Sequence, residues 1–149
     1  QFQSMISQAY GEFQERLGEK GLTPVWEMDR EPIAIMADGR QLWRILENLL
    51  GNIYKYALEN TRIDITLHRM GDMAVFSIEN TSREKLTIDA EELMGRFVRG
   101  DKSRNTEGSG LGLSIAQSLT QLQGGLFELH VDGELFRVTI QFPVAREGI

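Results

Sequence analysis

A glycine-rich turn precedes an amphipathic stretch near the C-terminus, in the run Gly108-Ser109-Gly110-Leu111-Gly112-Leu113. Because glycine has no Cβ, such a backbone can approach an anion closely, and the N–H groups of a following helix point at that anion. The chemistry that this pattern indicates is phosphate binding. The spacing fits neither a Walker loop nor a dinucleotide fingerprint. A tight turn or a helix-packing point is an equally good interpretation of one isolated loop.

A second polar cluster lies upstream, in the run Asn48-Leu49-Leu50-Gly51-Asn52-Ile53-Tyr54-Lys55-Tyr56-Ala57. Asn48 and Asn52 are four residues apart, and Lys55 and Tyr56 follow at helical spacing, so a helix can present all of them on one face. Carboxamide oxygens suit Mg²⁺, which keeps several waters when it binds nucleotide phosphates. Lys55 can reach a phosphate oxygen, and Tyr56 can offer its ring to a base. An amphipathic core helix is the alternative, but it does not explain two asparagines, which are poor helix formers.

Hydrophobic periodicity predicts the elements that must position these clusters. Apolar residues at helical spacing predict helices over residues 2–17, 39–58 and 111–122. Alternating apolar residues predict strands over residues 22–28, 33–36, 62–69, 73–80, 126–131 and 135–142. Asp38 is the expected N-cap of the second helix. The pairs Gly71-Asp72 and Asp132-Gly133 mark two hairpin turns, and Pro143 ends the last strand.

The segment between the second hairpin strand and the glycine-rich turn has a different character. We expect a short helix from Asp89 to Phe97. The following residues, Arg99 to Ser109, are polar and flanked by glycine, so we expect them to be mobile.

Composition restricts the class of protein. The chain has 149 residues, of which 41% are hydrophobic and 26% charged, so it suits one globular domain. A net charge of −6 argues against nucleic acid as a partner. The absence of cysteine excludes disulfides, thiol catalysis and cysteine zinc sites, and fits a cytoplasmic protein. No apolar run approaches the roughly 20 residues of a membrane span, and we see no signal peptide.

Taken together, these motifs resemble the ATP-binding catalytic domain of sensor histidine kinases. That family belongs to a superfamily with type II topoisomerase, heat-shock chaperone and mismatch-repair ATPases. Residues 48–57 resemble its N box, and residues 108–113 resemble its G2 box. Between them, the run Leu93-Met94-Gly95-Arg96-Phe97-Val98-Arg99-Gly100-Asp101-Lys102-Ser103-Arg104 resembles the F box and the start of the ATP lid. The resemblance covers residues 22–143, and three motifs in this order make it specific.

The resemblance implies a fold and an activity. The fold is an α/β (α+β) two-layer sandwich, with a mixed β-sheet packed on helices and a flexible ATP lid. Residues 21–145 form the ATP-binding catalytic domain, and residues 1–20 are an N-terminal helix or linker from the dimerisation region. The activity is transfer of the γ-phosphoryl group of Mg·ATP to a histidine on a separate dimerisation domain, for relay to a response regulator.

The phosphoacceptor is expected outside this chain. In the family the accepting histidine lies in a helical hairpin and is followed by an acidic residue, and neither His68 nor His130 has this setting. The resemblance therefore implies a cytoplasmic domain of a membrane-bound bacterial sensor. Its partners are the dimerisation domain and the response regulator, and it meets the membrane only through other parts of the protein.

The resemblance also implies a role for each polar residue of the long helix. Asn52 is the principal Mg²⁺ ligand, and Asn48 assists it, directly or through water. Lys55 contacts a phosphate, and Tyr56 contacts the base or the ribose. Asn52, Lys55 and Arg99 carry the catalysis, in which the protein mostly positions groups and neutralises charge.

Further contacts are implied for the lid and the glycine-rich turn. Arg99 and Arg104 are candidates for the terminal phosphates, because a guanidinium group binds phosphate in bidentate fashion. An exposed surface charge is an equally good interpretation of either arginine alone. The glycine-rich turn supplies backbone contacts to the nucleotide through Gly108, Gly110, Leu111, Gly112 and Leu113.

One motif departs from the family's pattern, at the end of the strand predicted over residues 73–80. The family's G1 box reads Asp-x-Gly-x-Gly, and its Asp accepts a hydrogen bond from the exocyclic amine of adenine. Here the run is Glu79-Asn80-Thr81-Ser82-Arg83-Glu84, so Asn80 takes the place of the Asp and both glycines are missing. An Asn carbonyl also accepts from an amine, but without the charge. Glu79 competes for this role, although strand alternation sends it to the other face of the sheet.

Two other functions stay open. One is a related ATPase or an anti-sigma-type serine kinase with the same nucleotide site, against which the run from Phe97 to Asp101 favours a sensor histidine kinase. The other is a nucleotide-sensing or partner-binding module that has lost catalysis, which the altered G1 box suggests. Phosphoryl transfer to the matching acceptor hairpin separates all three.

Overall fold

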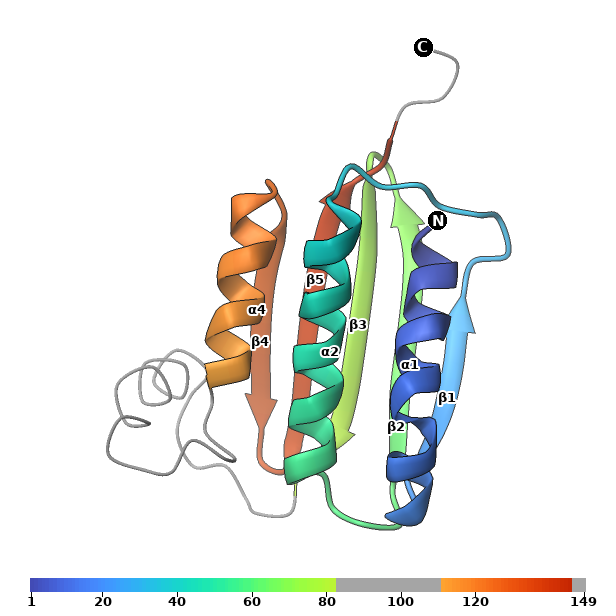
Figure 1. Cartoon of the computed structure of the whole chain (residues 1–149), viewed down its shortest axis with the longest axis vertical. Helices are drawn as coiled ribbons and strands as arrows, with labels where there is room; N and C mark the ends of the chain where they lie inside the picture. The colour runs from blue at the N-terminus through green and yellow to red at the C-terminus, as the bar shows by residue number, and fades with distance from the viewer. Residues whose placement is uncertain (83–110, 146–149) are drawn as a thin grey trace.

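The computed structural model describes residues 1–82 and 111–145, which form helices on one face of a five-stranded sheet (Figure 1). The helices are α1 (Phe2–Glu19), α2 (Gly39–Tyr56) and α4 (Leu111–Leu122). The strands are β1 (Thr23–Met28), β2 (Arg62–Met70), β3 (Met73–Thr81), β4 (Leu126–Asp132) and β5 (Leu135–Pro143). Their order in the sheet is β1-β2-β3-β5-β4, and β1 lies parallel to β2 while the other pairs are antiparallel. The predicted two-layer sandwich with a mixed sheet is confirmed.

The core lies between the sheet and the three described helices. Alternate residues of β2, β3 and β5 are buried, because successive side chains of a strand point to opposite faces. On the buried face, Ile65 of β2 lies opposite Ile78 of β3. The ring of Phe2 in α1 lies 5.9 Å from that of Phe76 and 6.2 Å from that of Phe142. Helix α1 therefore shares one core with the sheet, and the domain boundary proposed at residue 20 stays a prediction.

Most of the element boundaries agree with the sequence patterns. Asp38 caps α2 as predicted, and its carboxylate accepts from the backbone N–H of Gln41 at 3.0 Å. Both hairpin turns are confirmed, with Gly71 at φ +63° and Gly133 at φ +65°, a left-handed conformation that favours glycine. The helix expected over residues 89–97 and the lid expected over residues 99–109 lie outside the described residues.

The strand predicted over residues 33–36 is wrong. In this segment Ile35 forms an isolated bridge to Val144. The backbone N–H of Ile33 donates to Oε1 of Gln3 at 2.9 Å, and its carbonyl accepts from the N–H of Phe2 at 2.8 Å. Because the start of α1 takes these backbone groups, they do not contribute to a strand ladder.

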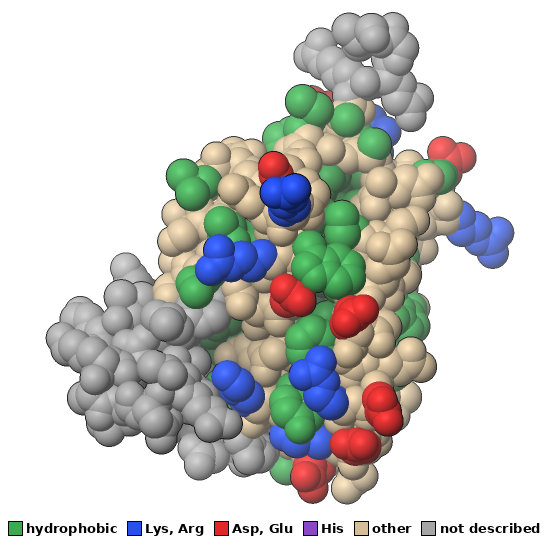
Figure 2. Space-filling model, in the orientation of Figure 1, with side chains coloured by type: hydrophobic (Ala, Val, Ile, Leu, Met, Phe, Trp, Pro, Cys, Tyr) green, Lys and Arg blue, Asp and Glu red, His purple; other side chains and the backbone are tan. Residues whose placement is uncertain are grey.

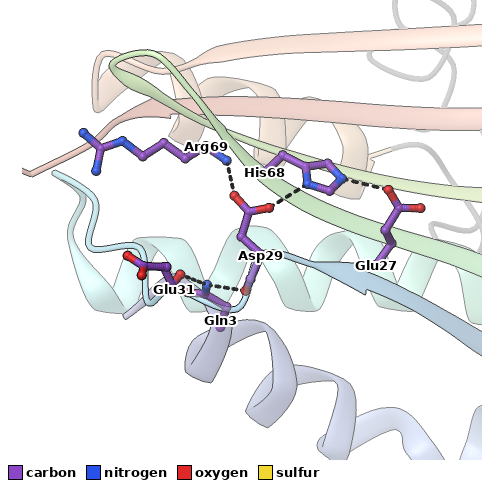
Figure 3. A network of polar contacts seen from close by, with 6 residues as sticks. All are labelled: Gln3, Glu27, Asp29, Glu31, His68 and Arg69. Atoms are coloured by element: carbon purple, nitrogen blue, oxygen red, sulfur yellow. Dashed lines mark hydrogen bonds and ion pairs between the residues drawn. The ribbon is translucent and has the colours of Figure 1, made fainter.

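A polar network holds β1 and the residues after it against β2 (Figure 3). The imidazole of His68 lies between two carboxylates, with Nδ1 2.9 Å from Oδ1 of Asp29 and Nε2 3.0 Å from Oε2 of Glu27. Asp29 also accepts from the backbone N–H of Arg69 at 2.8 Å. The side chain of Gln3 donates to the Asp29 carbonyl at 3.1 Å, which ties α1 to the same place. Only a doubly protonated imidazole can donate to both carboxylates at once.

The network shifts two pKa values in opposite directions. The hydrogen bond to Asp29 is the largest cause that raises the pKa of His68, and the bond to Glu27 acts in the same sense. The backbone N–H of Arg69, followed by the bond to His68, lowers the pKa of Asp29. Since the His68 side chain is 40% exposed, solvent screens these interactions, and we expect a small effect on stability.

We expect the domain to lose a small part of its stability as pH rises through the folded-state pKa of His68. The folded state favours the charged imidazole, so the stabilisation is fully present below the unfolded pKa of about 6.5 and disappears above the raised folded value. The replacement His68→Gln removes the titration. Urea unfolding between about pH 6 and about pH 9 measures the effect, because Asp29 titrates well below that range. The control is His130→Gln, at an exposed histidine of β4. A His68→Gln variant whose stability follows the same pH profile as the wild type would contradict this assignment.

Candidate functional site

The last turns of α2 carry the polar cluster that the sequence predicted. Asn48, Asn52 and Tyr56 are partly buried, and Lys55 is exposed. A stripe of buried apolar residues holds the helix on the sheet: Leu42, Ile45, Leu46, Leu49, Leu50 and Ile53. Helical spacing places Asn52 and Tyr56 beside this stripe, and Asn48 and Lys55 farther from it around the helix. The cluster therefore lies at the margin of the core, where a ligand can reach groups that are partly shielded from water.

Asn48 holds a buried donor that needs a partner. Its Nδ2 atom is buried and has no hydrogen-bond partner among the described residues. An unpaired buried donor costs about 1–3 kcal/mol, so such exceptions in a native fold require an explanation. A phosphate oxygen or a metal-bound water would satisfy this N–H group. The carbonyl oxygen of the same amide has the chemistry of a magnesium ligand.

The end of β3 supplies a second polar position. Asn80 is 4% exposed and Ser82 is 7% exposed, and both are buried polar residues in a sheet face that is otherwise apolar. Glu79 lies on the opposite face of the strand, where its carboxylate is 3.6 Å from the guanidinium group of Arg137. The prediction that strand alternation directs Asn80 and not Glu79 toward the helices is confirmed.

Backbone contacts join the end of β3 to the end of α2. Ala57 forms an isolated antiparallel bridge to Ser82, and the N–H of Leu58 donates to the carbonyl of Thr81 at 2.7 Å. The whole β2–β3 hairpin separates these segments in the sequence. The fold thus brings Asn80 to the same end of the molecule as the polar cluster of α2 (Figure 1).

Helix α4 begins at this same end and lies beside α2 (Figure 1). The first turn of α4 contains Leu111, Gly112 and Leu113 of the glycine-rich motif. The side chain of Leu113 is fully buried, so any contact that it makes with a nucleotide runs through its backbone. The N–H groups at a helix start suit a phosphate. The predicted residues Arg99, Arg104, Gly108 and Gly110 lie outside the described residues.

The sequence patterns do not predict the role of Lys20, which lies beside this cluster. Lys20 follows α1, and its Nζ atom donates to the carbonyl oxygen of Tyr54 in the last turn of α2. A single lysine before a glycine has no pattern that distinguishes it from a surface charge. Only the packing of α1 against α2 reveals the contact.

The described residues do not form a metal cage of their own. Within residues 1–82 and 111–145, no group of three or more His, Asp and Glu side chains is placed to hold a metal ion. A Mg²⁺ ion bound by one or two amides therefore needs phosphate oxygens and waters as its other ligands, which is the usual setting of Mg²⁺ at nucleotides. The helices in the same two ranges include none that is long and apolar enough to cross a membrane.

Comparison with known sequences identifies relatives. A family model described as histidine kinase-, DNA gyrase B-, and HSP90-like ATPase matches residues 37–146. The probable sensor protein PcoS of Escherichia coli is 38% identical over 110 residues, which are 71% of this chain and 24% of that protein. The sensor histidine kinase RppB of Synechocystis sp. is 37% identical over 109 residues, which are 70% of this chain and 24% of that protein. The chain thus spans about a quarter of the length of these curated relatives.

Solved structures share the fold. The nucleotide-free catalytic domain of histidine kinase ThkA superposes with a TM-score of 0.78 at 25% identity, over 95% of this chain and 93% of that one. Full-length ShkA in complex with AMPPNP gives a TM-score of 0.78 at 23% identity, over 100% of this chain and 31% of that one. ThkA in complex with the response regulator TrrA gives 0.76 at 22% identity, over 99% of this chain and 41% of that one.

The family match includes every described part of the candidate site. It covers α2 with its polar cluster, the end of β3 with Asn80, and the start of α4. The same segments meet at one end of the fold, and the solved catalytic domain of ThkA has this fold. The chain belongs to the family of histidine kinase-, DNA gyrase B-, and HSP90-like ATPases.

Proposed function

We propose that the chain is the ATP-binding catalytic domain of a sensor histidine kinase, which transfers the γ-phosphoryl group of Mg·ATP to a histidine on a separate dimerisation domain. One observation carries the proposal: the polar end of α2, the buried Asn80 and the start of α4 meet in one place. The relatives named as sensor kinases support the choice of histidine kinase within the ATPase family.

The proposed partners follow from the same relatives. The phosphoryl group passes to a response regulator, as the solved complex of ThkA with the response regulator TrrA suggests. The dimerisation domain of the same kinase is the first acceptor, and residues 1–20 are proposed to come from its side of the boundary. The domain works in the cytoplasm, and other parts of the full-length sensor meet the membrane.

The residues of α2 have distinct proposed roles. Asn52 offers its carboxamide oxygen as the principal Mg²⁺ ligand, and Asn48 assists with an amide whose buried N–H still needs a partner. Lys55 places a positive charge on a phosphate, and Tyr56 contacts the base or ribose side. These groups position the nucleotide and neutralise its charge, which is what phosphoryl transfer requires of a protein. Arg99 and Arg104 stay predictions for the terminal phosphates.

The direct test is phosphoryl transfer. The chain is incubated with Mg²⁺, γ-labelled ATP and the dimerisation hairpin of the same kinase. We expect label on the hairpin that is stable to base and labile to acid, as a phosphorus–nitrogen bond to histidine is. Label that survives acid would indicate a serine kinase, and ATP hydrolysis without labelled protein would indicate an ATPase.

The replacement Asn52→Ala tests the metal site. We expect affinity for Mg·ATP to fall by about tenfold or more, because the principal protein ligand of the metal is lost. Affinity for ATP in EDTA should stay the same. Calorimetric titration in the two conditions gives both numbers, and Gln121→Ala, at an exposed amide of α4, serves as the control. Wild-type affinity of Asn52→Ala in both conditions would remove Asn52 from the metal site.

The replacement Asn80→Asp tests recognition of the base. A carboxylate accepts from the exocyclic amine of adenine and repels the carbonyl of guanine, whereas an Asn amide can rotate to suit either base. We therefore expect Asn80→Asp to keep or tighten ATP binding and to favour ATP over GTP about fivefold more than the wild type does. Competition titrations with both nucleotides measure the ratio, and circular dichroism checks the fold because Asn80 is buried. If Asn80→Asp and Asn80→Ala both leave the two affinities unchanged, the base is recognised elsewhere.

A further inference from the structure

We propose that Lys20 is a positioning residue of the nucleotide site, which acts by fixing the peptide group between Tyr54 and Lys55. The inference rests on the proposed function, because it connects Lys20 to the nucleotide through Lys55. Lys20 lies outside the residues that the family model matches, 37–146. It lies at the end of α1 and belongs to none of the motifs that the sequence displays.

The contact occurs where α1 and α2 end side by side (Figure 1). The Nζ atom of Lys20 donates to the carbonyl oxygen of Tyr54 and lies 4.5 Å from the centroid of the Tyr54 ring. Figure 2 shows Lys and Arg side chains close to hydrophobic ones at this lower end of the helix layer. The ammonium group thus has two favourable interactions with one residue, a charge-assisted hydrogen bond and a cation–π contact.

The carbonyl of Tyr54 lacks the hydrogen bond that it would accept within a longer helix. In a continuing helix it would accept from the N–H of Leu58. Helix α2 instead ends at Tyr56, and the N–H of Leu58 donates to Thr81 of β3. The same break that joins α2 to β3 therefore leaves the Tyr54 carbonyl open, and Lys20 fills the position. A positive charge there also suits the negative end of the helix dipole.

The backbone of Lys20 is itself held on both sides. Its N–H donates to the carbonyl of Leu17 at 3.1 Å, and its carbonyl accepts from the N–H of Asn60 at 3.0 Å. The next residue, Gly21, has φ +74° and lies so close to Asn60 that a Cβ would be 2.2 Å from Oδ1. The side chain of Lys20 thus extends from a fixed point toward the end of α2.

Fixing this carbonyl also orients Lys55. The carbonyl of Tyr54 and the N–H of Lys55 belong to one planar peptide group, so a bond to the oxygen sets the plane from which Lys55 begins. Immediately beyond, Ala57 and Leu58 are bonded to β3. The last turn of α2 is therefore held from α1 on one side and from the sheet on the other. A site that is ordered before the nucleotide arrives loses less entropy when the nucleotide binds.

Arg16 provides a matched comparison. Its guanidinium group lies 5.9 Å from the centroid of the same Tyr54 ring and 4.4 Å from that of Phe13. Its hydrogen bond, at 3.1 Å, goes to the carbonyl of Glu12 within α1. The replacements Arg16→Met and Lys20→Met both remove a cation beside Tyr54. Only the second also removes the bond to the α2 carbonyl.

The experiment is a titration of Mg·ATP into the wild-type chain and its variants. We expect Lys20→Met to weaken binding about threefold to tenfold, Arg16→Met to stay within about twofold of the wild type, and Lys20→Arg to restore most of the loss. In a double-mutant cycle, Lys20→Met should cost much less in a Lys55→Met background, since its effect runs through Lys55. Amide hydrogen exchange in the last turn of α2 should be faster in Lys20→Met than in Arg16→Met. If Lys20→Met does not fold, Lys20→Leu takes its place, because it also removes the donor to the Tyr54 carbonyl.

Three outcomes would overturn the inference. These are wild-type affinity in Lys20→Met, equal losses in Lys20→Met and Arg16→Met, or a Lys20 effect that persists unchanged without Lys55. The proposed metal site fails separately, if Asn52→Ala keeps its affinity for Mg·ATP. Loss of binding in Asn52→Ala together with wild-type binding in Lys20→Met would reject the role of Lys20 alone.

Discussion

The candidate site depends on one constraint, which is that α2 ends against the end of β3. The bridge from Ala57 to Ser82 and the bond from Leu58 to Thr81 turn the chain out of the helix and pair it with the strand. These few backbone bonds bring the polar end of a helix beside a buried strand end, across the whole β2–β3 hairpin. They also create the open carbonyl that Lys20 fills. Most of what a nucleotide would meet among the described residues follows from this junction.

The face of the sheet that the described helices cover determines which side chains of β3 can take part in the candidate site. Since helices cover one face, every second residue of β3 is directed either into the core or away from the helices. Asn80 is buried and Glu79 forms an ion pair on the outer face with Arg137. A shift of one residue in register would exchange these two side chains and place a carboxylate in the core. The apolar residues that fix this register, such as Phe76 and Ile78, therefore also determine which polar side chain of β3 faces the helices.

Local patterns predicted much of this fold, and distant contacts account for what they missed. The cap at Asp38 and the left-handed glycines Gly71 and Gly133 depend on a few neighbouring residues, so the sequence displays them directly. The strand predicted over residues 33–36 failed because Gln3, far away in the sequence, takes the backbone N–H of Ile33. Lys20 was missed for the same reason, since its partner Tyr54 lies on another helix. Helical spacing alone predicted the polar cluster of α2, which consists of Asn48, Asn52, Lys55 and Tyr56. That Asn80 lies at the same end of the fold could not be predicted, because it depends on the junction of α2 and β3.

The site is built from groups that a stable core would avoid. Asn48 has a buried donor without a partner among the described residues, and Asn80 occupies an inward position that apolar residues fill elsewhere in β3. Each such group costs stability, so the fold must offset it with packing that is independent of the site. Helix α1 is suited to this, since Phe2 and Leu17 are almost fully buried at its opposite ends. Lys20, at the end of the same helix, donates to the carbonyl of Tyr54 in α2. Packing of α1 thus offsets the cost of the polar candidate site, because Phe2 and Leu17 are buried without being part of that site.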